Sequence, residues 1–346
     1  MQLTGERLAH VDQHYLRPDT YTRANSVLID AQAEIGLARL WGGGQVAAVD
    51  GMRFVVPIRT VDARPNPKYF GRKRGVTWLN MVSDRAIGLT GKVISGTPKD
   101  TLHVIDLVYN PDGGPTPDVV ITDQGSYSDV VFGILTLLGF DYRPVLADLP
   151  DAKLWRIDID KIDRHWPDIL RVVASVHTRE ISAHDVIGIL QHDGRLTGLG
   201  DAIAHYGRIF KTMHVLTFIQ DPAYRRQIKH MRNLQEGRHG LGRHIFHGRK
   251  GELHEAYHAG TEDQLGALGL VLNCVTLWNT IYLDHVIAIL RAAGHTINDG
   301  DAARLSAYQY LHVNVHGHYS FAPPEHPGHR RELRPPPPPA SPREIP

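Results

Sequence analysis

Between residues 45 and 150 the apolar pattern switches repeatedly between the period of a strand and that of a helix, and this order limits the possible folds. Three β-branched, apolar segments come first, separated only by glycine, proline or charged turn residues. A helix, a fourth strand, a second helix and a fifth strand follow. Because strands joined through a helix usually pair parallel, the order predicts an α/β fold with a mixed five-stranded sheet flanked by helices. Strands are expected at 45–58, 76–84, 86–96, 117–123 and 142–148, and helices at 99–109 and 128–139.

The rest of the chain divides into four further regions. Residues 1–44 predict a helical N-terminal connection that ends at three consecutive glycines. Strand signals then thin out, so residues 151–235 predict a helical insertion and residues 236–322 predict C-terminal helices. Residues 323–346 hold 10 of the 22 prolines, which predicts a disordered or extended tail.

A single cysteine, Cys274, excludes an intramolecular disulfide framework and cysteine-based zinc or iron–sulfur sites. It favours a reducing compartment, and the first residues lack the apolar core of a secretory signal, so we expect a cytoplasmic protein. The uncharged run 265–283 has nearly the length of a membrane span. Asn273, Thr276 and Thr280 fall on one face of that helix, which favours a buried amphipathic helix and no membrane partner.

The charges are segregated along the chain although the formal net charge is only +1. Residues 59–74 carry six basic residues against one acidic residue, and residues 222–250 carry eight against one. The rest of the chain is therefore net acidic. Two unrelated solvated faces would give this distribution, and so would one surface that binds a polyanion, provided that the two stretches share a face.

Asp50 and Asp123 each stand where a predicted strand meets a glycine-containing turn. Asp-Gly between apolar residues is a common hairpin signal, and T-D-Q-G is ordinary turn chemistry. The strand order adds a second interpretation, in which the first and fourth strands are neighbours and the two carboxylates converge at one edge of the sheet. Two converging carboxylates need a divalent cation if both are to stay ionised.

His254, Glu255 and His258 form H-E-x-x-H, the helical arrangement in which two imidazoles bind zinc and the glutamate acts as a base. With 22 histidines in 346 residues, this pattern arises easily by chance. No apolar run precedes His254, and the longer metzincin motif is absent after His258. A zinc metallopeptidase is therefore a remote alternative. The sequence also lacks a G-x-x-x-x-G-K-[ST] loop, which disfavours an NTPase.

Six longer segments resemble the catalytic region of the Tn3 family of replicative transposases. The resemblance is colinear and covers about residues 5–322, and several long motifs in the right order are far more specific than any single motif. The segments are WGGGQVAAVDGMRFVVPIRT, NPKYFGRKRGVTWLNMVSD, TDQGSYSDVVFGILTLLGFDYRPVLAD, EGRHGLGRHIFHGRKGEL, EDQLGALGLVLNCVTLWNTIYL and HVNVHGHYSF.

This resemblance implies an RNase H-like fold and a DDE triad of Asp50, Asp123 and Glu252, with the helical insertion before the helix that carries Glu252. It implies two Mg²⁺ ions, for which Mn²⁺ can substitute, with Asp50 bridging them and the other two acids each completing one shell. The implied reactions are nicking at the terminal inverted repeats of a transposon and transfer of the freed 3′-hydroxyl to target DNA. Double-stranded DNA is the implied partner, and a bacterial homo-oligomer on that DNA is expected.

The third carboxylate has alternatives, because a glutamate after Gly251 is often only a favourable charge in the first turn of a helix. Glu236 is the next candidate, and Glu255 is another. The basic stretches are expected to neutralise DNA phosphates largely without regard to sequence. The residues expected to do so are Arg72, Lys73, Arg74, Arg225, Arg226, Lys229 and Arg232.

Some features depart from the family pattern. Family members are considerably longer, and their N-terminal part, which recognises the inverted repeats, has no counterpart in this sequence. Gly125 and Ser126 stand where the family usually has an alanine-glycine pair. His312 and Asn314 match a family motif, although hydrogen bonding within the structure explains them equally well. The alternative function is a truncated, non-catalytic remnant that binds DNA or a full-length transposase.

Overall fold

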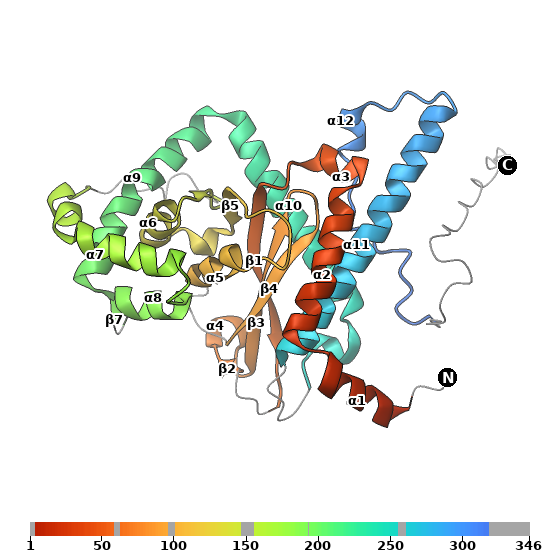
Figure 1. The fold of residues 1–346 in the computed structure, drawn as a ribbon, viewed down its shortest axis with the longest axis horizontal. Helices are drawn as coiled ribbons and strands as arrows, with labels where there is room; N and C mark the ends of the chain where they lie inside the picture. The colour runs from red at the N-terminus through yellow and green to blue at the C-terminus, as the bar shows by residue number, and fades with distance from the viewer. Residues whose placement is uncertain are drawn as a thin grey trace, which may run out of the picture. The chain divides into compact units, whose positions relative to one another are not determined.

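The structure is a computed structural model that describes residues 4–58, 63–95, 101–146, 156–192, 194–254 and 261–317. Residues up to Tyr310 belong to one compact unit, and Leu311 begins a second (Figure 1). In the second unit, the described residues 311–317 form turns. The predicted tail from residue 323 lies outside the described residues.

A mixed sheet crosses the first unit. Its main strands are β1 (Val46–Val55), β3 (Arg74–Ser83), β4 (Gly88–Ser95), β5 (Val119–Thr122) and β6 (Asp141–Tyr142). β3 pairs antiparallel with both β1 and β4, whereas β5 pairs parallel with both β1 and β6. The resulting order is β4-β3-β1-β5-β6. This confirms the mixed sheet that the order of strand and helix patterns predicts.

Two details of the sheet differ from the prediction. A two-residue strand, β2 (Arg64–Pro65), pairs with the start of β3 and adds a sixth strand. The last strand is shorter than expected, although the amides of Arg143 and Val145 still donate to carbonyl groups of β5. Pro144 between them directs its nitrogen away from β5, so its missing amide hydrogen breaks no bond of this edge strand.

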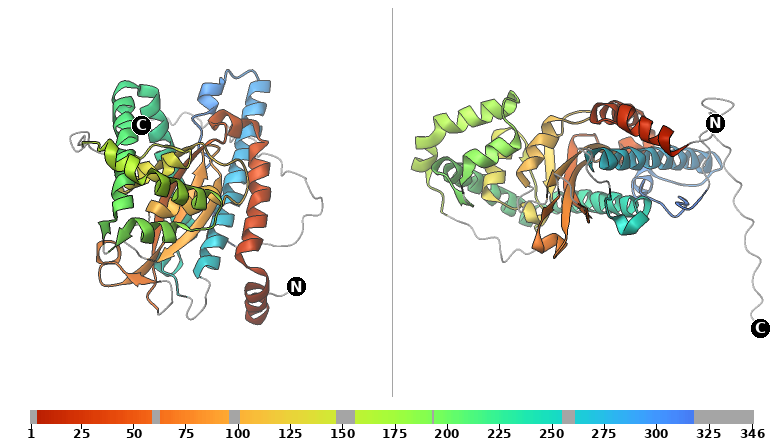
Figure 2. Two further views of the ribbon diagram at one scale, coloured as in Figure 1. Left: turned by 60° about the vertical axis from the view of Figure 1, so that its left-hand side comes forward. Right: turned by 90° about the horizontal axis from the view of Figure 1, so that it is seen from below.

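One face of the sheet is covered by the helices that lie between β4 and residue 221 in the chain (Figure 2, right). Ala47, Val49, Leu79 and Met81 lie in one buried cluster with apolar residues of these helices. The helices are α5 (Val104–Tyr109), α6 (Asp129–Leu137), α7 (Ile159–His177), α8 (Ala183–Leu190) and α9 (Gly198–Gln220). A small hairpin, β7 (Gln191–His192) with β8 (Arg195–Leu196), separates α8 from α9.

α6 and α9 cross so closely that only glycine fits at the crossing. A Cβ atom on Gly207 would lie 1.9 Å from the carbonyl oxygen of Asp129, and a Cβ atom on Gly133 would lie 2.4 Å from the carbonyl oxygen of Ile203. Both obstacles are backbone atoms, so no side chain can move aside to make room. The crossing therefore depends on the two glycines.

We expect Gly207→Ala to lower the free energy of unfolding by about 2–3 kcal/mol, because the two helices must separate to admit the methyl group. Urea unfolding followed by circular dichroism measures this change. Gly188→Ala in α8 is the control, since nothing lies within 4 Å of a Cβ atom there. That control should keep or raise stability. Equal stability of the two variants would contradict the close crossing.

The opposite face packs against α10 (Pro222–Ile245) and α11 (Thr261–Ala292). Met52, Phe54 and Trp78 point to this side and lie in one cluster with Leu241 and Leu272 of the two helices. Alternate residues of β1 thus face different layers, as the pleat of a strand requires. α10 is continuous across residue 235, where the sequence patterns place the end of the insertion.

α11 is long and apolar enough to cross a membrane by length and composition alone. Its polar residues Asn273, Thr276 and Thr280 are nevertheless fully buried. The Asn273 side-chain oxygen accepts a hydrogen bond of 2.9 Å from the amide of Gly88, and the Thr280 hydroxyl oxygen accepts one of 3.0 Å from Gln32. This confirms the prediction of a buried amphipathic helix.

The N-terminal residues form α1 (Gly5–Tyr15), α2 (Pro18–Ala33) and α3 (Gly36–Trp41). α2 lies along α11 (Figure 1). The side chain of Asp284 in α11 accepts a hydrogen bond of 2.9 Å from the amide of Leu37, which fixes the start of α3. The remaining short elements are α4 (Pro67–Phe70), α12 (Asp299–Ala302) and 3₁₀ turns at Thr101–His103, Gln124–Ser126 and Gly248–Gly251.

Candidate active site

Asp50 and Asp123 come together at one cavity between the sheet and α10. β1 and β5 pair in parallel up to Val49 and Thr122, so the two aspartates are the next residues in register. Both line a cavity of about 330 Å³. The remaining lining residues are Ala48, Val49, Ile121, Thr122, Gln124, Val145, Arg232, Gln235 and Glu236. The convergence expected from the strand order is therefore present.

The two carboxylates are held by different local contacts. The backbone amide of Gly51 donates a hydrogen bond of 2.7 Å to Oδ1 of Asp50. The hydroxyl of Ser126 donates one of 2.9 Å to Oδ1 of Asp123. Tyr142 in turn donates to the carbonyl oxygen of Ser126 at 2.8 Å, which holds the turn against the sheet. Ser126, one of the departures from the family pattern, thus orients the second aspartate, a role that the sequence does not reveal.

Glu236 supplies a third carboxylate at the rim of the cavity. It lies on α10, one turn after Arg232, and the two side chains form an exposed ion pair of 3.0 Å. The helix is fixed against the sheet on both sides of this point. Ile228 clusters with Ala48 of β1, and the ring of Phe246 lies 5.6 Å from that of Phe54. α10 therefore runs alongside β1 in the same direction.

Glu252 lies away from this cavity. The amide of the next residue, Leu253, donates to the carbonyl oxygen of Val55 at 2.9 Å, five residues beyond Asp50 on β1. Five residues of a strand span about 17 Å. The Glu252 carboxylate accepts a hydrogen bond of 2.8 Å from Lys73, and this bond, with a smaller contribution from nearby His254, lowers the pKa of the glutamate.

The predicted zinc motif can be followed only at its first residue. Nε2 of His254 lies 3.3 Å from the Glu252 carboxylate. Glu255 and His258 lie outside the described residues. Within the described ranges, no three His, Cys, Asp or Glu side chains are grouped closely enough to hold a metal ion together.

Most of the predicted DNA-binding residues lie near the two ends of β1, whereas Arg232 lines the cavity itself. Arg72, Lys73 and Arg74 are exposed at the start of β3, beside the end of β1. Arg226 and Lys229 are exposed on α10 near the beginning of β1. Arg225 differs from the others because its guanidinium donates hydrogen bonds of 2.5 and 2.7 Å to the carbonyl oxygens of Phe218 and Ile219 at the end of α9.

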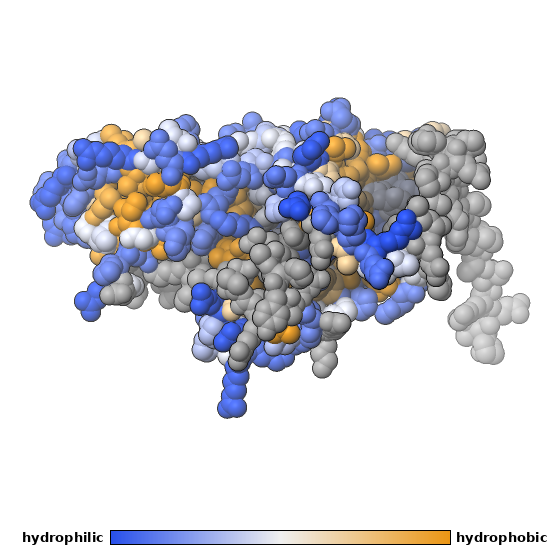
Figure 3. All heavy atoms as spheres, turned by 60° about the horizontal axis from the view of Figure 1, so that its bottom comes forward, coloured by the Kyte–Doolittle hydropathy of each residue, from blue (hydrophilic) through white to orange (hydrophobic). Residues whose placement is uncertain are grey.

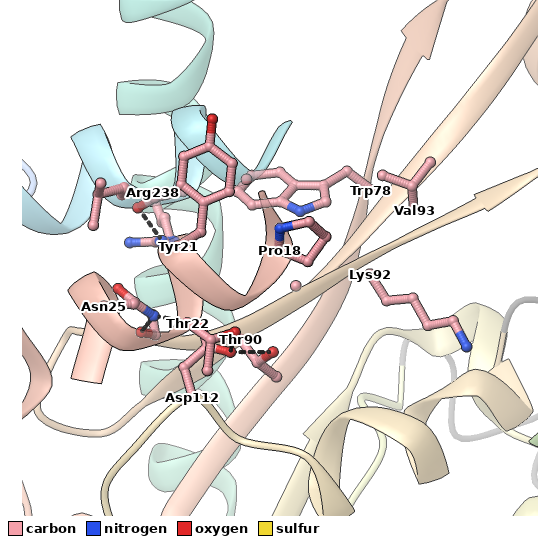
Figure 4. Close-up of a pocket in the computed structure, with 15 residues that line it drawn as sticks. Pro18, Tyr21, Thr22, Asn25, Trp78, Thr90, Lys92, Val93, Asp112 and Arg238 are labelled. Carbon is pink, nitrogen blue, oxygen red and sulfur yellow. Dashed lines mark hydrogen bonds between the residues drawn. The ribbon is translucent and has the colours of Figure 1, made fainter. Parts of the chain in front are cut away.

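A second cavity, of about 250 Å³, lies between α2, α11 and the strands β3 and β4 (Figure 4). Its carboxylate, Asp112, accepts hydrogen bonds of 2.7 Å from Asn25 and 3.1 Å from Thr90. Burial raises the pKa of Asp112 despite these bonds. Because Asp112 is the sole carboxylate among the residues that line it, this cavity does not suit two divalent ions.

The residues of the first cavity fit a hard divalent cation. Asp50, Asp123 and Glu236 line this cavity with carboxylate oxygens, the ligands that Mg²⁺ and Mn²⁺ prefer, although the three are not grouped closely enough to hold one ion together. Oε1 of Gln235, which lines the same cavity, is buried and has no hydrogen-bond partner among the described residues. A buried polar atom of this kind needs a ligand, a water molecule or an ion.

The sequence matches the family model described as the Tn3 transposase DDE domain at residues 1–159 and 156–319. It is 56% identical over 345 residues to the transposase for transposon Tn4556 of Streptomyces fradiae, covering 95% of this chain and 39% of that protein. It is 41% identical over 340 residues to the transposase for transposon gamma-delta of Escherichia coli K12, covering 93% and 34%.

Identity to the transposase for transposon Tn1546 of Enterococcus faecium is 30% over 336 residues, covering 92% of this chain and 34% of that protein. The chain thus spans between a third and two fifths of the length of these curated relatives. A comparison with solved structures finds no match.

Proposed function

Because the chain belongs to the Tn3 transposase family, as its motifs indicate, we propose that it is the catalytic part of a DDE transposase with an RNase H-like fold. The convergence of Asp50 and Asp123 at one cavity carries this proposal. The proposed reactions are hydrolytic nicking at the terminal inverted repeats, which frees a 3′-hydroxyl, and attack of that hydroxyl on a target phosphodiester. The strand order β4-β3-β1-β5-β6 supports the proposed fold.

The two aspartates would hold the divalent cations, Mg²⁺ or Mn²⁺. When bound, such ions stabilise the charge that develops on the phosphate and make an attacking oxygen available near neutral pH. The protein orients both carboxylates before a metal ion binds, because the amide of Gly51 donates a hydrogen bond to Asp50 and the hydroxyl of Ser126 donates one to Asp123. Carboxylates oriented in this way bind metal rather than act as the main acids or bases.

For the third ligand we propose Glu252, the position that the family resemblance assigns. Glu252 must then leave Lys73 and approach the cavity when DNA binds. The side chain of Lys73 is 60% exposed and that of Glu252 is 19% exposed, so water partly screens the ion pair and its net contribution to stability is small. Glu236 is the competitor, because it lines the cavity without any rearrangement. The two assignments predict opposite effects of Glu252→Gln and Glu236→Gln on DNA cleavage.

DNA would lie across the cavity, between the two basic stretches. Arg226 and Lys229 stand near the beginning of β1, and Arg72 to Arg74 stand near its end. β1 has 10 residues and so spans about 33 Å, close to one turn of B-form DNA at about 34 Å. A duplex could therefore contact both stretches at once. The end of the molecule where β2, β3 and α4 meet carries a largely hydrophilic surface (Figure 3).

We expect the triple substitution of Arg72, Lys73 and Arg74 by alanine to weaken duplex binding and to flatten its salt dependence. Each lost phosphate contact removes about 0.9 from the slope of log K against log salt concentration, so the slope should fall by up to about 3 units. Fluorescence anisotropy at several salt concentrations measures the slope. Binding by the unsubstituted chain should be nearly equal for inverted-repeat and random duplexes.

The control for this slope is a triple alanine variant on the opposite face of the sheet. Arg164 and Arg171 on α7 and Arg195 in the small hairpin are all exposed there. Its slope should equal that of the unsubstituted chain. Equal slopes for both triple variants would remove the basic stretch from the DNA-binding surface, and a preference for the inverted repeat of about 10³-fold would place sequence recognition within this chain.

The direct test of the proposed function is incubation of the purified chain with end-labelled duplexes that carry family-type inverted repeats, in the presence of Mg²⁺ or Mn²⁺. The proposal predicts nicking at the transposon end that leaves a 3′-hydroxyl. DNA binding without nicking in the presence of either metal would favour the alternative function, a non-catalytic remnant that binds DNA or a full-length transposase.

A further inference from the structure

Three buried polar side chains lie between β3, β1 and α10, directly behind the candidate metal site. Asn80 is 1% exposed, Gln235 is 2% exposed and His239 is 5% exposed. Asn80 is the residue of β3 that pairs with Asp50 of β1. Buried polar groups cost stability unless they are hydrogen-bonded, so the function of this cluster must be sought in its bonds.

The hydrogen bonds around His239 select one of its two neutral forms. The side-chain amide nitrogens of Asn80 and Gln235 lie 3.2 and 3.3 Å from Nε2 of His239. An amide nitrogen can only donate, so Nε2 must accept, and the imidazole proton must then lie on Nδ1.

The orientation of the two amides is itself determined by their other contacts. The side-chain nitrogen of Asn80 also lies 3.1 Å from the backbone carbonyl oxygen of Asp50, which can only accept. The side-chain oxygen of Asn80 accepts a bond of 2.8 Å from the nitrogen of Gln235. Turning the Asn80 amide over would place oxygen against oxygen and nitrogen against nitrogen.

Nδ1 of His239 faces the candidate metal ligand. It lies 3.7 Å from Oδ2 of Asp50, while Oδ1 of the same carboxylate accepts a hydrogen bond of 2.7 Å from the amide of Gly51. One carboxylate oxygen is thus held by the backbone, and the other lies opposite an imidazole N–H. Polar groups behind a metal ligand commonly orient it and tune its affinity for the ion.

We propose that His239 is a positioning residue, whose Nδ1–H form, fixed by Asn80 and Gln235, orients the Asp50 carboxylate for divalent-cation binding. The inference rests on the proposed role of Asp50 as a metal ligand. The inference goes beyond that role because it explains why α10 carries a buried histidine directly opposite Asp50. A purely structural histidine, which only ties α10 to β3, would leave the metal affinity unchanged when removed.

The test is a Mn²⁺ titration of the full chain, followed by electron paramagnetic resonance of the free ion. His239→Ala should weaken Mn²⁺ binding about 10- to 100-fold. His239→Asn should recover most of the affinity, because its amide nitrogen can donate from nearly the position of Nδ1. The matched control is His205→Ala in α9, where a similarly buried histidine accepts a bond of 3.0 Å from the amide of Asp158.

The outcomes separate this inference from the proposed function. Loss of binding in Asp50→Asn together with unchanged binding in His239→Ala overturns the role of His239 and leaves the metal site in place. Unchanged binding in Asp50→Asn overturns the metal site, and the inference falls with it. If His239→Ala does not fold, ¹⁵N NMR of the histidines in the unsubstituted chain decides, since the inference requires the Nδ1–H form and an Nε2–H form would refute it.

Discussion

Asp50→Asn and Asp123→Asn are each expected to abolish divalent-dependent nicking of a transposon-end duplex. Each change removes an anionic metal ligand, and metal ions supply several kcal/mol of stabilisation to such reactions, which corresponds to a loss of about 10³-fold or more. The fold should persist, because Asp123 is exposed and Asp50 faces the open cavity. End-labelled DNA on a denaturing gel measures the cleavage rate, and thermal unfolding checks the fold.

The control for both variants is Asp112→Asn in the second cavity. That residue is a carboxylate in the bend between α5 and β5, where it accepts hydrogen bonds from the neutral side chains of Asn25 and Thr90, and it does not line the candidate metal site. Its variant should cleave at the rate of the unsubstituted chain. Cleavage at full rate by Asp50→Asn or Asp123→Asn would show that these two aspartates do not hold the catalytic ions.

Glu252→Gln is expected to abolish nicking as completely, while Glu236→Gln should retain most of the rate. Both changes keep the size of the side chain and remove its charge, so the comparison isolates the ligand role. Neither should affect folding strongly, since Glu236 pairs with the exposed Arg232, and Glu252 pairs with the exposed Lys73 and with His254. Single-turnover cleavage with Mn²⁺ and with Mg²⁺ measures both variants.

The opposite effects of the two substitutions on cleavage would make Glu236 the third metal ligand. Loss of nicking in Glu236→Gln with full activity in Glu252→Gln would mean that the carboxylate already at the cavity is the ligand, and that no rearrangement of the segment around Gly251 is needed. His254→Ala should have little effect in either case. Loss of a tightly bound zinc ion in that variant would instead support the metallopeptidase alternative.

The sequence alone predicted the mixed sheet, and it offered the convergence of two acids as one of two interpretations. Helices before the last two strands favour parallel pairing there, whereas β1 and β3 pair antiparallel although β2 and α4 lie between them in the chain. The structure decides the open question, because it makes β1 and β5 parallel neighbours. Asp50 and Asp123 must then converge, because parallel neighbours end at the same edge. The polar face of Asn273, Thr276 and Thr280 likewise followed from helical periodicity.

The rest depends on contacts between residues far apart in the chain. The register of α10 on β3 is fixed by hydrogen bonds among Asn80, Gln235 and His239, which join residues about 160 positions apart and leave no periodic signal in the sequence. The sequence predicts that Arg225 binds DNA phosphates, but its guanidinium donates hydrogen bonds to the last carbonyl groups of α9. The position of Glu252 follows from how Leu253 pairs with Val55, which no local pattern encodes.

The most direct test of the central claim is the position of the bound metal. Crystals of the chain with a transposon-end duplex, soaked in Mn²⁺ and measured at the manganese absorption edge, would locate the ions by their anomalous signal. We expect a peak between the carboxylates of Asp50 and Asp123, with both aspartates as ligands. A peak only beside His254, or occupied manganese elsewhere with none between the two aspartates, would contradict it.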